Sequence, residues 1–193
     1  MKRKVKTKVK GFRTTDGAGV KLVRVLGNLT TKEFDPILML DSFDSINPDD
    51  YTAGFPMHPH RGIETISYVS RGKMVHRDSL GNEAGISDGE VQWMNSGSGI
   101  MHEEMVPAAE RLLGDVYIDG EHIEEKTAVK LTEGDSLTIK NGNEKAQVLY
   151  MNSRALNEPV AWAGPIVMNT QEELQKAFLE LRSNTFIKET AEY

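Results

Sequence analysis

The feature that most constrains the fold is a series of short segments in which apolar and polar residues alternate. Six of them are typical of strands with one buried face: Thr65–Val69, Lys73–Arg77, Val91–Met94, Asp115–Ile118, Ser136–Lys140 and Gln147–Met151. Turn pairs such as Arg71-Gly72, Asp88-Gly89 and Asn141-Gly142 separate these segments. Many short strands at close spacing favour an antiparallel sandwich or barrel.

One segment near the end departs from this pattern. Thr170 and Glu173 have the spacing of a capping box, in which each side chain accepts a hydrogen bond from the other residue's backbone N–H at the start of a helix. The apolar residues that follow recur at helical spacing, at Leu174, Ala177, Phe178 and Leu181. The sequence therefore predicts a C-terminal amphipathic helix that packs on the sheet.

Cysteine is absent from all 193 residues. Thiol catalysis, iron–sulfur clusters and cysteine-bound zinc are therefore excluded, and any metal must be held by histidine and carboxylate side chains. The sequence shows neither the apolar segment of a secretory signal at its start nor an apolar run long enough to span a bilayer. We expect a soluble cytoplasmic protein with no membrane partner, or one that also enters the nucleus if its source is eukaryotic.

Positive charge is concentrated in Met1–Arg13, which holds seven basic residues and no acidic one. Such a stretch can contact nucleic acid or an acidic partner. However, Val5, Val9 and Phe12 are spaced among the lysines, which is typical of a solvated edge strand protected by lysine. The net charge of −6 also argues against nucleic acid as a partner.

Two pairs of side chains at strand spacing point to a metal site. Residues i and i+2 of a strand share a face, so His58 lies beside His60, and His102 beside Glu104. If the two stretches are neighbours, three imidazoles and a carboxylate converge in an apolar interior, which is costly unless they bind an ion. This donor set suits one divalent ion, and Fe(II), Mn, Ni, Cu and Zn all remain open.

The same alternation of faces, in which residues of equal parity (both even-numbered or both odd-numbered) share a face, places the other histidines and carboxylates. Glu64 shares the parity of His58 and His60, so on geometry alone it is a possible ligand or a group next to the ligands. Glu103 has the opposite parity and should face solvent. His76 and His122 have no partner at strand spacing, and we interpret both as structural or exposed.

Three motifs together resemble the pirin family of the cupin superfamily. They are His58-Pro-His-Arg-Gly-Ile-Glu-Thr-Ile-Ser-Tyr68, the segment Gly89–Met105 with its Gly-Ile-Met-His-Glu-Glu-Met ending, and the segment Glu158–Thr170 with its Gly-Pro-Ile-Val-Met-Asn-Thr ending. The resemblance covers nearly the whole chain. It implies a mostly β, cupin-type antiparallel barrel of the jelly-roll kind, followed by a C-terminal helix. It also implies that His58, His60, His102 and Glu104 bind iron, as Fe(II), and that Glu64 lies beside the ligands.

The length differs from that of the family. Pirins are similar to two stacked cupin barrels, whereas here Glu110–Gly114 leads almost at once into Asp115–Gly120, which resembles the later half of the second barrel. The resemblance thus indicates an internal deletion. It predicts an N-terminal cupin-like part with the metal site, residues 1–112, and a shortened C-terminal part with the helix, residues 113–193. We expect these to pack as one composite barrel, with a strand-exchanged homodimer as the alternative.

Two functions follow from the resemblance. One is an Fe(II)-dependent quercetin (flavonol) 2,3-dioxygenase, in which Glu104 accepts the proton of the flavonol 3-hydroxyl. The apolar candidates for its lining, which are equally well explained as core, are Phe55, Ile66, Met94, Ile100 and Met101. The alternative is a non-catalytic, redox-sensitive iron protein that acts through protein contacts, and the indicated deletion favours this less catalytic role. A structural metal or an empty barrel is a third interpretation.

Overall fold

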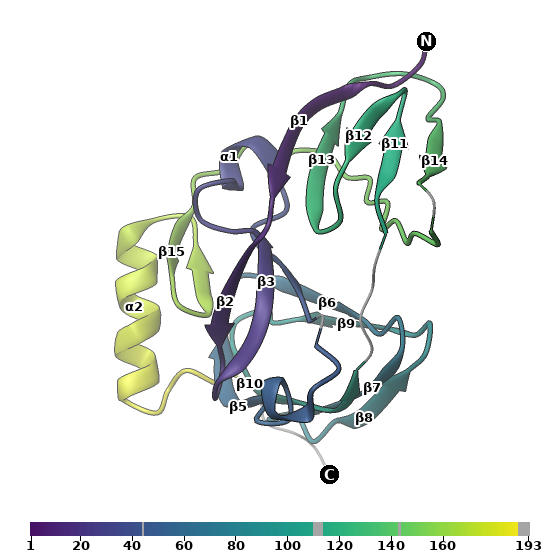
Figure 1. Ribbon diagram of the computed structural model, residues 1–193. Helices are drawn as coiled ribbons and strands as arrows, with labels where there is room; N and C mark the ends of the chain where they lie inside the picture. The colour runs from purple at the N-terminus through teal and green to yellow at the C-terminus, as the bar shows by residue number, and fades with distance from the viewer. Residues whose placement is uncertain (44, 110–113, 143, 189–193) are drawn as a thin grey trace. The chain divides into compact units, whose positions relative to one another are not determined.

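A computed structural model describes residues 1–43, 45–109, 114–142 and 144–188 (Figure 1). Contacts group the described residues into two units, each assembled from three stretches of the chain. The first unit contains the described parts of Met1–Thr15, Lys21–Asp44 and Arg111–Asn157. The second contains those of Asp16–Val20, Ser45–Glu110 and Glu158–Tyr193.

The first unit is built from small antiparallel sheets. Strand β1 (Val5–Lys10) pairs with β13 (Thr127–Leu131). A second sheet has the order β12–β11–β14, and a third the order β2–β3–β4. The bounds are Phe12–Asp16 for β2, Val20–Leu26 for β3, Leu40–Ser42 for β4, Val116–Ile118 for β11, Glu121–Ile123 for β12 and Ile139–Asn141 for β14, with a short helix α1 at Thr31–Phe34. Buried Val116, Ile118 and Ile123 form a core on which Val5 and Val129 pack.

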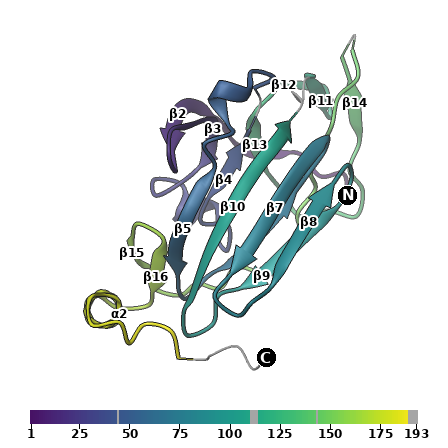
Figure 2. The same cartoon turned by 90° about the horizontal axis from the view of Figure 1, so that it is seen from below.

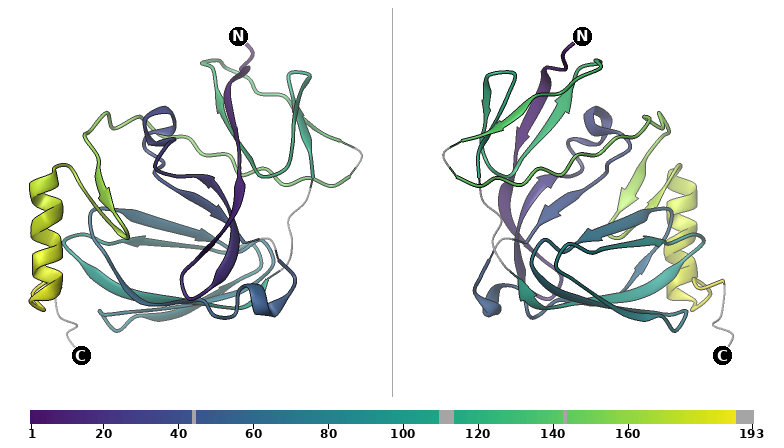
Figure 3. Two further views of the ribbon diagram at one scale, coloured as in Figure 1. Left: turned by 60° about the vertical axis from the view of Figure 1, so that its left-hand side comes forward. Right: turned by 90° about the vertical axis from the view of Figure 1, so that its right-hand side faces the viewer.

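The second unit contains a four-stranded antiparallel sheet of order β5–β10–β7–β8, seen side by side in Figure 2. These strands are β5 (Phe55–His60), β7 (Gly72–Asp78), β8 (Glu83–Ser87) and β10 (Ile100–Ala109), and a 3₁₀ turn, η1 (Pro48–Asp50), precedes them. Strands β6 (Glu64–Tyr68) and β9 (Val91–Asn95) form a separate two-stranded sheet. This sheet lies across from the larger one in Figures 1 and 3, and Ser67 Oγ on β6 reaches Glu104 Oε1 on β10 at 3.2 Å.

A hairpin and a helix complete this unit. Strands β15 (Ala161–Ala163) and β16 (Ile166–Met168) pair with each other, and helix α2 (Gln171–Arg182) packs beside them (Figure 3). The predicted capping box is present, because Thr170 accepts from the Glu173 N–H and the Glu173 side chain accepts from the Thr170 N–H. Leu174 and Ala177 are buried against Ile166, with Phe178 and Leu181 at the edge of this core. The predicted helix and its apolar face are confirmed.

Most of the predicted strands are present, with two exceptions. Ser136–Lys140 contributes only its end, as β14, and Gln147–Met151 forms no strand. The described strands form six sheets of two to four strands, and none of these sheets closes into a barrel. The predicted boundary between residues 112 and 113 falls in residues 110–113, outside the described residues. That boundary, the composite barrel and the strand-exchanged dimer stay predictions.

The described residues include no helix with the length and apolar character needed to cross a membrane.

Candidate metal centre

The register of the four-stranded sheet gathers histidines and carboxylates on one of its faces. On one side of β10, His102 lies opposite His58 and Ile100 lies opposite His60. On the other side, His102 lies opposite Asp78 and Glu104 opposite His76. Directly paired residues of antiparallel strands project to the same face. The parity argument therefore holds for all the predicted ligands, and the register adds the pair His76 and Asp78.

Three imidazoles form a compact group at the junction of β5 and β10. The ring centroids of His58 and His102 are 4.3 Å apart, and His60 lies 4.8 Å from each of the other two rings. Candidate ligand atoms of His58, His60 and His102 all lie within 4.8 Å of one another. His102 is 1% exposed. The structure thus brings together the three histidines that the sequence singled out.

Backbone carbonyls fix the orientation of two of these rings. His58 Nδ1 lies 2.8 Å from the Pro56 carbonyl oxygen, and His60 Nδ1 lies 2.7 Å from that of Pro165. Since a carbonyl can only accept, each ring in its neutral form carries its proton on Nδ1 and a lone pair on Nε2. These two Nε2 atoms lie 3.1 Å apart. Two facing lone pairs repel each other, and a cation between them would remove that repulsion.

The third imidazole has an unused nitrogen. His102 Nε2 is buried and has no hydrogen-bond partner among the described residues. A buried polar atom without a partner costs about 1–3 kcal/mol. Two ligands about 2.1 Å from one ion at right angles are about 3 Å apart, which matches the separation of the His58 and His60 Nε2 atoms. The donor set therefore fits a divalent metal ion.

Glu104 belongs to a second, overlapping group. Its candidate ligand atoms lie within 4.8 Å of those of His76 and His102. His102 is therefore common to both groups, while Glu104 groups with His76 and not with His58 and His60. The carboxylate of Glu104 accepts a hydrogen bond from Ser67 Oγ at 3.2 Å.

Burial determines the charge state of this cluster. Desolvation lowers the pKa of His60 to about 4, although its hydrogen bond to Pro165 opposes this. Desolvation, followed by the neighbouring imidazoles of His58 and His60, lowers the pKa of His102 to about 3. Burial raises the pKa of Glu104, against the hydrogen bond from Ser67. At neutral pH the rings of His60 and His102 are thus uncharged, as metal binding requires.

His76 was interpreted from the sequence as structural or exposed, and the structure places it in this cluster. It is 3% exposed, its Nδ1 lies 3.3 Å from His102 Nδ1, and its Nε2 lies 3.2 Å from Asp78 Oδ2. A signal was present in the sequence, because His76 and Asp78 have the same i, i+2 spacing that identified the other pairs. His122 is exposed and pairs with Asp115 in the first unit.

Two further expectations from the sequence are wrong, those for Glu64 and Ile66. Glu64 is exposed and accepts from Asn95 Nδ2 at 3.2 Å, on the outward face of β6, so it does not lie beside the ligands. Ile66, expected in the lining, shares that face and is 70% exposed. The reason is the turn between β5 and β6, where Gly62 has a φ of +75° and interrupts the alternation that begins at His58.

The remaining apolar residues that were expected to line the site do not all lie on the same face of the sheet. Met94 and Ile100 are buried, and the Phe55 ring lies 6.4 Å from His58. Ile100 shares the face of His102, whereas Met101 has the opposite parity on β10 and lies on the other face. Glu103 lies on that opposite face, as expected, and its partly exposed carboxylate pairs with exposed Arg77.

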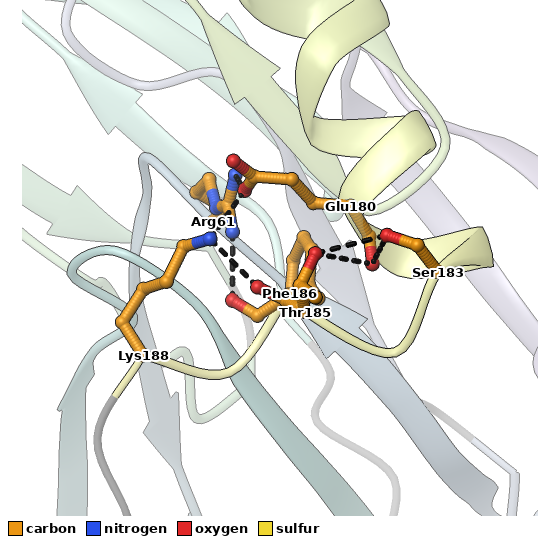
Figure 4. A network of polar contacts seen from close by, with 6 residues as sticks. All are labelled: Arg61, Glu180, Ser183, Thr185, Phe186 and Lys188. Carbon is orange, nitrogen blue, oxygen red and sulfur yellow. Dashed lines mark hydrogen bonds and ion pairs between the residues drawn. The ribbon is translucent and has the colours of Figure 1, made fainter.

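Arg61, the residue after His60 in the sequence, forms a largely buried ion pair that attaches the C-terminal segment to the sheet (Figure 4). Arg61 is 7% exposed and donates to Glu180 Oε2 on α2 and to the Phe186 carbonyl, each at 2.7 Å. Its guanidinium carbon also lies 4.1 Å from the centre of the Phe186 ring. Lys188 Nζ lies 2.9 Å from Glu180 Oε2 and completes the network. Arg61, which follows the candidate ligand His60 in the sequence, is thus held in place by α2 and by the residues after α2.

The family model of Pirin matches residues 19–117, which is more than half of the chain. The chain belongs to the pirin family. The model of the Pirin C-terminal cupin domain matches residues 100–187, so the two matches share β10 and the start of β11. The predicted family is confirmed.

Individual pirin-family relatives cover the chain to different extents. A protein of Pseudomonas aeruginosa, named as a candidate quercetin 2,3-dioxygenase, is 56% identical over 95 residues, which are 49% of this chain and 33% of that protein. The chain therefore matches only about a third of that relative's length. A pirin-like protein of Caulobacter vibrioides is 30% identical over 268 positions, covering 92% of this chain and 97% of the relative. Because this alignment is longer than the chain, part of that relative has no counterpart here.

Among solved structures, a quercetin 2,3-dioxygenase from Acinetobacter baumannii superposes with a TM-score of 0.75. The match covers 96% of this chain and 99% of that one at 19% identity, so it shows the fold. The predicted mostly β, cupin-type fold with a C-terminal helix is therefore confirmed.

Proposed function

We propose that this pirin-family chain binds one divalent metal ion, Fe(II), and acts as a quercetin 2,3-dioxygenase. The proposed ligands are His58, His60, His102 and Glu104. The observation that carries the proposal is the arrangement of imidazole nitrogens. His58 and His60 present Nε2 lone pairs 3.1 Å apart, and the buried Nε2 atom of His102 has no partner among the residues that the structure describes.

The surrounding residues have roles that follow from their positions. When bound, the ion would supply a Lewis acid with coordination positions open to oxygen donors of a substrate. Glu104 would accept the proton of a flavonol 3-hydroxyl, because burial raises its pKa and makes the carboxylate a stronger base. Ser67 orients that carboxylate by donating to Oε1. Met94 and Ile100 would exclude water from the site.

The first experiment is elemental analysis of the purified protein, which identifies the metal and distinguishes Fe(II) from Mn, Ni, Cu and Zn. Anaerobic loading with Fe(II) should give one equivalent per chain, and quercetin should then be consumed together with dioxygen. His58→Ala and His102→Ala should each lose the metal, whereas His122→Ala, in the first unit, should retain it. A metal-loaded protein that binds quercetin and never turns it over would contradict the dioxygenase proposal.

A second candidate function is a redox-sensitive regulator that acts through protein contacts. It is favoured by an apolar surface on the outward face of β6 and β9. Ile66 pairs with Trp93 and Tyr68 with Val91, and these four side chains are 46–70% exposed. A contiguous exposed apolar surface is typical of protein contact sites. A regulator requires a partner whose affinity changes with the oxidation state of the iron, and that affinity should fall in the double variant Ile66→Ser/Trp93→Ser.

A further inference from the structure

Behind His102, on the side away from His58 and His60, lies a pair of side chains that the proposed function does not use. His76 Nδ1 is 3.3 Å from His102 Nδ1, and His76 Nε2 is 3.2 Å from Asp78 Oδ2. The side chains of His76 and Asp78 are both 4% exposed. Asp78, His76 and His102 therefore form a buried series of hydrogen bonds that ends at His102 Nε2, which has no partner in the described part of the protein.

Which atom donates in each of these hydrogen bonds follows from the carboxylate of Asp78. An ionised carboxylate only accepts, so His76 in its neutral form must carry its proton on Nε2 and donate it to Asp78. His76 Nδ1 then has a lone pair and accepts from His102 Nδ1. His102 is thereby left with its proton on Nδ1 and its lone pair on Nε2, the atom required for a metal bond.

We propose that Asp78 and His76 are positioning residues that hold His102 in the Nδ1–H tautomer and so direct its Nε2 lone pair to the metal. The function that this inference gives to Asp78 and His76 rests on the proposed metal centre. The tautomer itself is a property of the metal-free protein and is measurable there. The arrangement extends the common pairing of a ligand histidine with a carboxylate by one intervening imidazole.

The turn between β7 and β8 fixes the Asp78 carboxylate, at which this series of hydrogen bonds begins. Asp78 Oδ1 accepts from the Leu80 N–H at 2.9 Å and from the Asn82 N–H at 3.1 Å. The Asn82 side-chain amide donates to Oδ2 at 2.9 Å. These donors favour the ionised form and, together with burial, keep Asp78 from rotating away from His76.

The competing assignment makes His76 itself a ligand, in the group of His76, His102 and Glu104. An ion between His76 and His102 would occupy the space between their Nδ1 atoms, and His102 Nδ1 could then carry no proton. The two assignments therefore predict opposite protonation of one atom. His58 and His60 are bonded to carbonyls through Nδ1 and present Nε2, so the positioning assignment gives all three histidines the same tautomer.

The test is a long-range ¹H–¹⁵N correlation spectrum of the full chain labelled at histidine, first without metal and then with Zn(II). We expect the wild type to carry the His102 proton on Nδ1 in both states. His76→Phe removes the acceptor, so the Nε2–H form should become detectable and the dissociation constant for Zn(II) should rise about 10- to 100-fold. His76→Gln offers an amide oxygen as acceptor and should restore the Nδ1–H form and most of the affinity.

The chain offers a matched control in the first unit. His122 Nε2 lies 2.9 Å from Asp115 Oδ2, and both side chains are 43–47% exposed. His122→Phe and Asp115→Asn should change neither the tautomer of His102 nor the Zn(II) affinity. If His76→Phe shows no cooperative melting transition, Asp78→Asn carries the test, with an expected loss of about tenfold in Zn(II) affinity.

The outcomes separate this inference from the proposed function. A wild type that carries the His102 proton on Nε2, or loses it from Nδ1 when Zn(II) binds, overturns the positioning role even if metal is bound. A His76→Phe variant that folds with unchanged tautomer and affinity also overturns it. If the wild type shows the Nδ1–H tautomer and its dependence on His76 but binds neither Zn(II) nor Fe(II), the positioning role stands and the proposed metal function fails.

Discussion

The Nδ1 atom of His60 lies 2.7 Å from the carbonyl oxygen of Pro165, which follows it by 105 residues in the sequence. The next residue, Arg61, strengthens the same contact, because its carbonyl accepts from the Val167 N–H at 3.1 Å and its side chain reaches Glu180. The orientation of a proposed metal ligand therefore depends on the hairpin of β15 and β16 near the end of the chain. We expect changes at this contact to affect both stability and metal binding.

Gly62→Ala should push the chain after β5 away from β16. A Cβ atom at Gly62 would overlap the Val167 carbonyl oxygen, in addition to the strain of a φ of +75°. We expect a loss of roughly 3 kcal/mol in the free energy of unfolding and weaker metal binding. Gly89→Ala is the control, since Gly89 has a φ of +81° and open space around it, and it should cost about 1 kcal/mol with unchanged metal affinity. Urea unfolding and metal titration of both variants measure the difference, and equal effects would contradict the role of the close contact.

Acid should weaken the attachment of the C-terminal segment. The hydrogen bonds from Lys188 and then from Arg61 lower the pKa of Glu180 below its usual value of 4.5. A carboxyl group whose pKa is lower in the folded state contributes stability above its unfolded pKa, and this contribution is lost as the pH falls through the folded pKa. Glu180→Gln should therefore be less stable than wild type at pH 7, and the gap should narrow as the pH falls below 4.5. Urea titrations of both proteins between pH 7 and pH 3 measure the gap, and a constant gap would count against the ion-pair network.

Truncation of two neighbouring residues of β9 should change the free energy of unfolding by very different amounts. Met94 is 8% exposed, whereas Trp93 is 68% exposed on the outward face. Met94→Ala should cost about 2–4 kcal/mol because it leaves a cavity. Trp93→Ala should change the free energy of unfolding by less than about 0.5 kcal/mol. Denaturant unfolding of the two variants tests the register of β6 and β9, and the reverse order of effects would contradict it.

Metal removal should lower thermal stability. An ion that binds only the folded chain stabilises it by about 2.7 kcal/mol at a hundred times its dissociation constant. For a chain of this length, that corresponds to a rise of about 5–10 °C in Tm. Anaerobic melting with Fe(II), and again after addition of a chelator, measures the shift. His102→Ala should show no shift, and a shift of full size in that variant would remove His102 from the ligand set.

Local patterns predicted those parts of the fold that local residues determine. The alternation in Val91–Met94 and the capping box at Thr170 each depend on neighbouring residues, and both are present as expected. The convergence of His58, His60 and His102 could also be predicted, because i, i+2 spacing and one assumed strand pairing are enough. Gln147–Met151 has the composition of a strand but forms none, since a strand also requires a partner that local sequence does not specify.

The rest of the site depends on register and on long-range contacts. Only the register shows that Glu104 lies opposite His76 and that Asp78 lies opposite His102. Extending the parity of His58 through the turn at Gly62 failed, because a residue with positive φ interrupts the alternation of a strand. The contact of His60 with Pro165 could not be predicted, because nothing near His60 in the sequence indicates which carbonyl will lie beside it.

The Nδ1 atoms of His58 and His60 are both hydrogen-bonded to main-chain oxygens, those of Pro56 and Pro165. Every amino acid has such an oxygen, so these contacts place no direct demand on the side chains at positions 56 and 165. During evolution the support of the two rings can therefore persist while the residues that provide it change. Analyses of residue identity or covariation will tend to miss this support, and it must be sought in the backbone geometry of each relative.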